Sequence, residues 1–226
     1  MGSLIAPRST QTQVRHIILE KYLSAWGGII INALKGRAKL AEQRRNSFKL
    51  HLVYVDCFAG VGRYSKDVGK EFLPEEEFIP GSPLIGVKVL DELKNWAKSS
   101  YGIEVTSNAI LIESKSNRIN ELKRSIRLAE LASRIRDSDD FSSMEDGEIT
   151  VVHADSTTAA NRLLNYTKSG YKFSFYFLDP YGPKGIPLSF VSSVITNQRH
   201  DVMINMPYQD LHKKTGLVAH SGEIDQ

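Results

Sequence analysis

Five short apolar runs, each ending in polar residues, constrain the fold of this chain more than any other feature. Segments with the 3.6-residue period of amphipathic helices separate them. Runs of this kind, joined through helices, indicate a parallel sheet covered by helices on both faces. We therefore predict an α/β fold with a doubly wound, mostly parallel sheet. The expected strands are 51–56, 109–113, 149–153, 173–178 and 201–205.

An N-terminal helical extension precedes this sheet. We assign residues 1–50 to the extension and 51–226 to the α/β domain. Apolar side chains recur at the helical period from Gln11 to about Arg45 and form one buried face. Gly27 and Gly28 offer a point at which the pattern could divide into two helices.

The helices that connect the expected strands have readable boundaries. Ser82 is the expected N-cap of the helix after the first strand, with Pro83 at its first position. Further helices are expected at 116–136 and 156–168, and another begins near Pro187.

The composition excludes several classes of protein. The 226 residues suffice for one sizeable core. The single cysteine, Cys57, leaves no disulfide partner and no thiol cluster for a zinc or iron–sulfur site, so we expect a reducing compartment and no metal. No apolar run approaches the length of a bilayer span, and the first residues lack the pattern of a signal peptide. We therefore expect a soluble, cytoplasmic protein.

The net charge of +3 is too small to indicate nucleic-acid binding by itself, but the charges are clustered. Each cluster is open to two interpretations, a solvated face or an interaction surface, and the basic ones could attract a phosphate backbone. The first basic cluster comprises Lys35, Arg37, Lys39, Arg44, Arg45 and Lys49. The second comprises Lys115, Arg118, Lys123, Arg124 and Arg127. The acidic cluster comprises Asp137, Asp139, Asp140, Glu145, Asp146 and Glu148.

A glycine-containing turn follows the first expected strand. Ligands of doubly wound folds bind beyond the carboxyl ends of the strands, so the residues there are the candidates for function. The turn reads Asp56-Cys57-Phe58-Ala59-Gly60-Val61-Gly62. Its two glycines let the backbone turn sharply and approach a ligand without a Cβ atom in the way. Asp56 could bind a cofactor amino group or orient the glycine turn, and an ordinary strand-to-helix turn is the structural alternative.

Acids end the next two strands. Glu113 could bind both hydroxyls of a ribose, or it could cap a helix. Asp155 could contact an adenine amino group, or it could act as the N-terminal acid of the next helix. A polar insertion, 63–80, separates the glycines from the following helix. In dinucleotide-binding folds the glycine loop passes directly into the helix whose N-terminus binds the pyrophosphate. The insertion separates the two here, so a cofactor without phosphate fits better.

The fourth strand ends in a loop with several chemically useful side chains. Asp179-Pro180-Tyr181 is followed by Gly182-Pro183-Lys184-Gly185. The prolines and glycines fix an exposed loop that projects an acid, an aromatic ring and a lysine, which favours function over a plain turn. After the fifth strand, Asn205-Met206-Pro207-Tyr208 could line the same cleft, or it could be a turn.

These strand ends together resemble those of the Rossmann-like methyltransferases that use S-adenosylmethionine. The resemblance implies that the acid–glycine turn, the start of the next helix and the two strand-end acids bind this cofactor. It also implies that the loop after the fourth strand carries the chemistry. The implied cofactor-binding residues are Asp56, Phe58, Ala59, Gly60, Gly62, Ser82, Glu113 and Asp155, and the implied catalytic residues are Asp179, Pro180 and Tyr181.

A more specific resemblance rests on six segments together: 16–19, 22–26, 53–64, 81–85, 178–182 and 185–187. Through them the chain resembles one family still more closely, the three-Cys-motif partner proteins. This resemblance implies a bacterial protein that works beside a three-Cys-motif protein, often in phage or mobile-element surroundings, and it leaves the reaction open. A complete methyltransferase sheet adds a sixth and a seventh strand, so we expect C-terminal strands to be missing or the open edge to be closed otherwise.

The residues narrow the reaction that such a protein could perform. Cytosine C5 methylation needs a thiolate facing the base, and Cys57 is misplaced for that role and expected to be buried. Methyl transfer to nitrogen or oxygen needs alignment and a proton acceptor, for which Asp179 is the candidate. Asp179-Pro180-Tyr181 is similar but not identical to the loop of methyltransferases that hold an extruded base. A nucleic acid or another macromolecule is therefore the expected acceptor. The alternatives are a non-catalytic partner-binding or sensing module and a nicotinamide-dependent enzyme.

Overall fold

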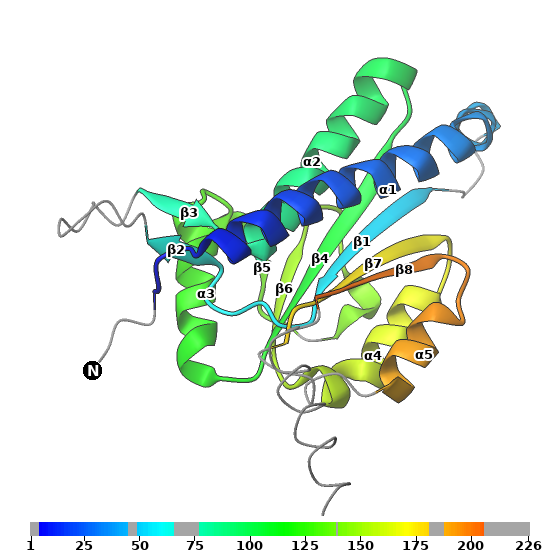
Figure 1. Cartoon of the computed structure of the whole chain (residues 1–226). Coiled ribbons are helices and arrows are strands. Elements are labelled where there is room, and N and C mark those ends of the chain that lie inside the picture. The colour runs from blue at the N-terminus through cyan, green and yellow to red at the C-terminus, as the bar shows by residue number, and fades with distance from the viewer. Residues whose placement is uncertain (1–4, 45–48, 66–76, 139, 181–187, 206–226) are drawn as a thin grey trace, which may run out of the picture.

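The computed structural model describes residues 5–44, 49–65, 77–138, 140–180 and 188–205. Their central feature is a six-stranded sheet with the order β5-β6-β4-β1-β7-β8 (Figure 1). Every neighbouring pair in this sheet is parallel. The prediction of a Rossmann-like α/β fold with a parallel sheet is therefore confirmed. The strands are β1 (Leu50–Asp56), β4 (Val105–Glu113), β5 (Ile135–Arg136), β6 (Ile149–His153), β7 (Lys172–Leu178) and β8 (His200–Ile204).

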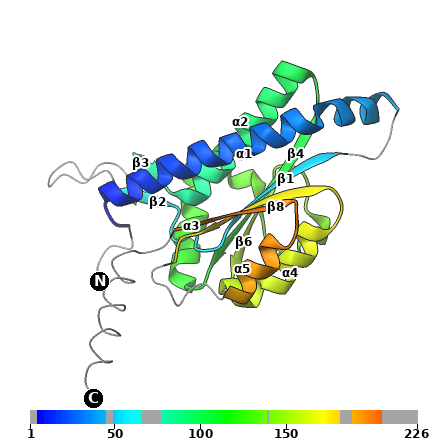
Figure 2. The ribbon, with the colours of Figure 1, turned by 45° about the vertical axis from the view of Figure 1, so that its right-hand side comes forward.

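Helices cover both faces of the sheet, as the doubly wound prediction requires. On one face lie α1 (Thr10–Gln43), α2 (Ser82–Tyr101) and α3 (Ser116–Leu128), and on the other lie α4 (Ser156–Lys168) and α5 (Leu188–Ile195) (Figures 1 and 2). Alternation along β1 divides its side chains between two cores. Leu52 and Tyr54 join the first, and Val53 and Val55 join the second. Burial on both sides explains why this strand is a continuous apolar run in the sequence.

Within the N-terminal extension, α1 runs without a break from Thr10 to Gln43, so the suggested division at Gly27 and Gly28 is wrong. Gly27 instead allows close helix packing, because a Cβ atom there would lie 2.3 Å from Leu93 Cδ1 of α2. Leu19 and Leu23 of α1 are fully buried in the first core. By length and composition, Thr10–Ala41 could also cross a membrane. Here it packs beside α2 across the sheet, and the chain has the organisation of a soluble α/β domain (Figure 2).

Two predicted helix boundaries are corrected. Gly81, not Ser82, is the N-cap of α2, and it makes no side-chain capping bond. The helix expected at 116–136 ends at Leu128. Glu130 then adopts a left-handed conformation with φ of 61°, and the Leu131 N–H donates to the Ile126 carbonyl. This pattern terminates a helix, and it frees 135–136 to pair with β6 as β5.

A small antiparallel hairpin lies within the predicted polar insertion. It pairs β2 (Arg63–Ser65) with β3 (Phe78–Pro80). Two short 3₁₀ turns flank β5: η1 (Ala132–Arg134) precedes it, and η2 (Phe141–Ser143) lies between β5 and β6. The expectations about Tyr181, the rest of its loop and any strands after 205 fall outside the described residues.

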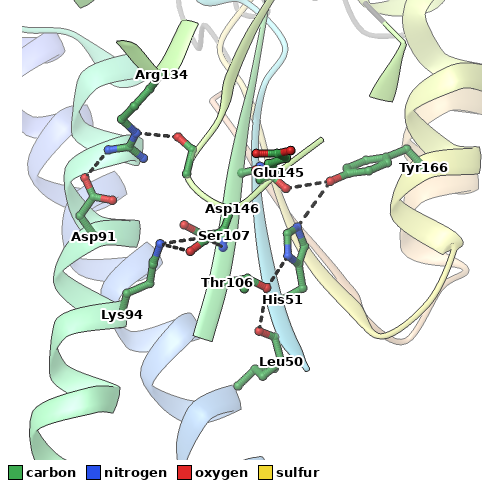
Figure 3. A network of polar contacts seen from close by, with 12 residues as sticks. Leu50, His51, Asp91, Lys94, Thr106, Ser107, Arg134, Glu145, Asp146 and Tyr166 are labelled. Carbon is green, nitrogen blue, oxygen red and sulfur yellow. Dashed lines mark hydrogen bonds and ion pairs between the residues drawn. The ribbon is translucent and has the colours of Figure 1, made fainter. Parts of the chain in front are cut away.

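Polar side chains at the amino edge of the sheet form one connected network (Figure 3). His51 Nδ1 lies 2.7 Å from the Thr106 hydroxyl, and the Tyr166 hydroxyl donates to Asn108 Oδ1 at 2.9 Å. Asp146 accepts from the Ser107 N–H at 2.8 Å and pairs with Lys94 of α2 at 2.7 Å. These bonds fasten the loop before β6 to the starts of β1 and β4.

The acidic cluster is largely structural. Asp146 belongs to the network above, and Glu148 pairs with Arg136 at 3.1 Å. Asp137 pairs with Lys123 at 3.1 Å, and Asp140 caps η2. Asp139 lies outside the described residues. Four of the six acids are thus used in contacts within the described part of the fold.

Candidate functional site

The predicted site residues come together at the carboxyl edge of the sheet. In the parallel register, Asp56 of β1 lies beside Leu111 of β4, and Glu113 lies beside His153 of β6. The chain leaves β1 toward β4 and β6, then returns to β7 on the other side of β1. The connections therefore diverge between β1 and β7, which is the place where open α/β sheets bind ligands. Asp179 follows β7 at this point.

The glycine turn after β1 is anchored to the strands on both sides. The Cys57 N–H donates to the Phe177 carbonyl at 3.0 Å, and the Ala59 N–H donates to the Ile112 carbonyl at 2.9 Å. Gly60 has φ of 61°, and a Cβ atom placed on it would meet no atom within 4 Å. The turn thus presents an open backbone at the edge of the two central strands. Such backbone accommodates a ligand at close range.

The second glycine has a packing role. Gly62 has φ of 76°, and a Cβ atom there would lie 2.7 Å from Leu122 Cδ1 of α3. Its carbonyl accepts from the Gly81 N–H at 2.9 Å, so the turn and the start of α2 touch through their backbones. Glycine at 62 is therefore explained without a ligand, whereas the open space at Gly60 is not.

Asp56 is completely buried beneath this turn. Its carboxylate accepts from the Phe58 N–H at 3.1 Å and from the Tyr54 hydroxyl at 3.2 Å. Burial raises the pKa of Asp56 to about 7; hydrogen bonds from Ser82, Phe58 and Tyr54 oppose this shift, and the nearby Asp179 adds to it. Of the two roles considered for Asp56, orienting the glycine turn is the one for which the structure provides contacts.

The other two acids also make local bonds. Glu113 is 6% exposed and accepts from the Lys115 N–H at 2.9 Å, while Arg118 approaches it at 3.9 Å. Asp155 is the exposed N-cap of α4 and accepts from the Thr158 N–H at 2.8 Å, which lowers its pKa. The Asp155 contact matches its capping alternative, whereas Glu113 accepts from the N–H of the N-cap residue Lys115 and from no amide of the first turn of α3. The three strand-end acids share one edge but differ in exposure, with Asp56 deepest and Asp155 at the surface.

Asp179 is the most strongly contacted strand-end acid. Arg15 of α1 donates to both carboxylate oxygens, at 2.9 and 3.0 Å, and the Asn205 amide donates to Oδ1. Asn205 therefore lies in the same site, as one of its two interpretations predicted. Pro180 is buried beside Asp179, and Tyr181 is outside the described residues. Sequence reasoning missed Arg15, since a polar residue in a helical repeat carries no signal of a partner 164 positions away.

Arg63 is a second residue that the sequence did not reveal. It is 2% exposed and donates to the Ser125 hydroxyl at 2.7 Å and to Glu121 of α3 at 2.8 Å. The Ser125 hydroxyl in turn donates to the Val61 carbonyl at 2.5 Å. This chain of bonds fixes the far side of the glycine turn to α3. An isolated arginine after two glycines gives no indication of such a role.

The chemistry available at this edge is that of carboxylates, backbone amides and an arginine. Cys57 is buried, and burial raises the pKa of its thiol well above the usual range, so it stays protonated, as the prediction of a small buried residue requires. Within the described ranges, no group of three or more His, Cys, Asp or Glu side chains could hold a metal ion. A carboxylate such as Asp179 can accept a proton from a nucleophile held nearby.

The family models searched give no match to this chain, and no curated protein shows significant sequence similarity to it.

Proposed function

We propose that this protein binds S-adenosylmethionine at the carboxyl edge of its sheet and transfers the methyl group to nitrogen or oxygen on a nucleic acid or another macromolecule. The observation that carries the proposal is the open backbone of Gly60, next to the divergence of β1 and β7. The sequence resemblance gives further support. On that basis we place the chain in the three-Cys-motif partner protein family, with a three-Cys-motif protein as its partner in the bacterial cytoplasm.

We assign a role to each site residue from the contacts that it makes. The turn 58–62 and Ser82 would lie against the cofactor, with Asp56 holding the turn from below. Glu113 would bind the ribose and Asp155 the adenine, which requires each to exchange a local bond for one to the ligand. Bound S-adenosylmethionine supplies an electrophilic methyl group. Asp179 would accept the proton that the acceptor loses, and Arg15 and Asn205 would hold its carboxylate in place.

Calorimetric titration with S-adenosylmethionine tests the cofactor site. We expect Gly60→Ala to weaken binding at least about tenfold, because the new methyl group enters the space of the ligand and strains a left-handed residue. Gly102→Ala is the matched control, since Gly102 has φ of 68° with nothing within 4 Å but lies at the C-cap of α2. Binding by neither wild type nor control would refute the proposal, and equal losses in both variants would refute the role of Gly60.

A second candidate function is a non-catalytic module that binds the cofactor for partner recognition or sensing. The double hydrogen bond from Arg15 favours it, because it occupies both oxygens of the proposed proton acceptor. Labelled methyl transfer separates the two functions. Wild type would be given labelled cofactor with DNA, RNA and a three-Cys-motif protein in turn. Label on any of them supports the enzyme, and cofactor binding without labelled product supports the module.

A further inference from the structure

A hollow of about 940 Å³ opens at the amino edge of the sheet, at the opposite end of β7 and β8 from the candidate site. The loop between α4 and β7 and the loop between α5 and β8 form its walls. Lys168 ends α4, Tyr171 comes from the first loop, and Asn197, Gln198 and Arg199 come from the second. No acidic side chain is among its described lining residues.

The hollow lies in a strongly basic part of the surface. Lys168 is exposed, and the positive charges of Lys168 and Arg199 both act on the neighbouring His200, whose pKa is lowered chiefly by burial. Arg37 reaches the same place from the C-terminal half of α1, with its guanidinium 4.4 Å from the centre of the Tyr171 ring. Arg37, one residue of the first basic cluster, thereby joins two loops that are more than 120 residues away along the chain. A concentration of cations without lining acids attracts polyanions.

An aromatic ring stands among these cations. Tyr171 is 44% exposed, and the guanidinium of Arg199 lies 5.4 Å from its ring centre, in addition to that of Arg37. Arg199 also donates to the carbonyls of Gly170 and Lys168, which fixes the loop that carries the ring. Unpaired bases stack on flat guanidinium and phenol groups, and lysine side chains bind the phosphates. Stacking of unpaired bases uses the ring and the charges together, so we favour a single strand over a bilayer surface or an acidic protein.

We infer that this amino-edge patch, defined by Arg37, Lys168, Tyr171 and Arg199, binds single-stranded nucleic acid. The inference rests on the proposed function in that it names the acceptor class, but the binding itself needs no cofactor. β7 has seven residues and separates the patch from Asp179 by roughly 20 Å. At the roughly 3.4 Å spacing of a duplex strand, a strand anchored on the patch would reach the candidate site over roughly six nucleotides.

Fluorescence anisotropy with a labelled 20-nucleotide single strand of mixed sequence tests the patch in the full chain without cofactor. We expect Arg37→Glu and Lys168→Glu each to weaken binding about tenfold at low salt and to reduce the salt slope by about one. Tyr171→Ala should weaken binding about tenfold through lost stacking. Lys21→Glu is the control, because Lys21 is exposed on the same helix as Arg37, about 24 Å along its axis, and makes the same change of charge.

Several results would overturn the inference. One is an affinity of the patch variants equal to that of Lys21→Glu, with all variants folded by circular dichroism. Another is wild-type protein that binds anionic phosphatidylserine vesicles or a poly-glutamate peptide but not the single strand. Neither result bears on the calorimetric test of Gly60. Conversely, loss of cofactor binding in that test would leave a positive anisotropy result standing.

Discussion

Polar residues lie at both ends of this sheet, but they make different kinds of contact at the two ends. At the amino edge, His51, Thr106, Asn108, Asp146 and Tyr166 mostly bond to one another and to Lys94 (Figure 3). At the carboxyl edge, acids follow individual strands, and the backbone is open at Gly60. The side chains of the amino-edge network mostly satisfy one another, with the buried Ser107 hydroxyl left unpaired, whereas the backbone of the carboxyl edge keeps room for a ligand at Gly60. A polar strand end is therefore a stronger candidate for function where the backbone beside it is open, as at Gly60.

The pKa shifts of the buried ionisable groups also have opposite directions at the two edges. Burial raises the pKa of Asp56 to about 7, and burial, reinforced by Lys172, lowers the pKa of His51 to about 4. Both groups are therefore shifted toward their neutral forms. Each shift makes stability depend on pH, but with opposite signs.

The largest expected effect concerns Asp179 at the carboxyl edge. Replacement by alanine should reduce labelled methyl transfer by about 10²- to 10⁴-fold, because the acceptor loses its general base, while the affinity for S-adenosylmethionine stays nearly unchanged. Asp201→Ala is the control on the neighbouring strand, since among the described residues its carboxylate contacts only the Tyr22 hydroxyl, at 3.5 Å, and the Val202 N–H. Undiminished methyl transfer by Asp179→Ala would show that Asp179 is not the general base, and the carboxyl edge would then lose its proposed catalytic residue.

The next effect is a pH dependence of stability that arises from Asp56. Its native pKa lies above the unfolded value, so the native state holds the proton longer and the free energy of unfolding falls as pH rises from about 4 to about 7. The loss is on the order of 4 kcal/mol and is complete above that range. Asp56→Asn should remove this fall, as measured by urea denaturation at several pH values.

The histidines change stability in the opposite direction over part of that range. His51 and His16 have lowered pKa values, so their contribution is complete above pH 6.5 and is lost as pH falls toward 4. They are the same in wild type and Asp56→Asn, so the difference between the two curves isolates Asp56. Parallel curves would mean that Asp56 is not buried as described.

The smallest effect concerns the amino edge. Tyr166→Phe should lower the free energy of unfolding by about 1–3 kcal/mol, because the buried Asn108 Oδ1 loses its donor. Cofactor affinity should not change. Tyr22→Phe is the control: its exposed hydroxyl makes only a 3.5 Å contact with Asp201, so a change below about 0.5 kcal/mol is expected. A loss of cofactor binding in Tyr166→Phe would show that the two edges are coupled.

Much of the fold was predictable because its signals are local. The apolar runs and their polar ends located β1, β4, β6, β7 and β8 to within a few residues, and α4 has the predicted bounds. The errors arose where packing or backbone geometry overrides the pattern. Gly27 looked like a break but accommodates Leu93, and the helix after Glu113 stopped where Glu130 turns left-handed. β5 could not be predicted, because it has only two residues and they form a strand by pairing with β6.

For the candidate site, the sequence by itself determined which residues follow the strands, because strand ends are set by local apolar pattern. Their grouping at one edge also follows from the parallel sheet that this pattern implies. Only the tertiary structure decided what each of them contacts. Asp179 meets Arg15, Arg63 meets α3, and Arg37 meets Tyr171 through contacts between segments far apart in the chain. Such pairs depend on how the helices pack on the sheet, and no periodicity within a single segment encodes that packing.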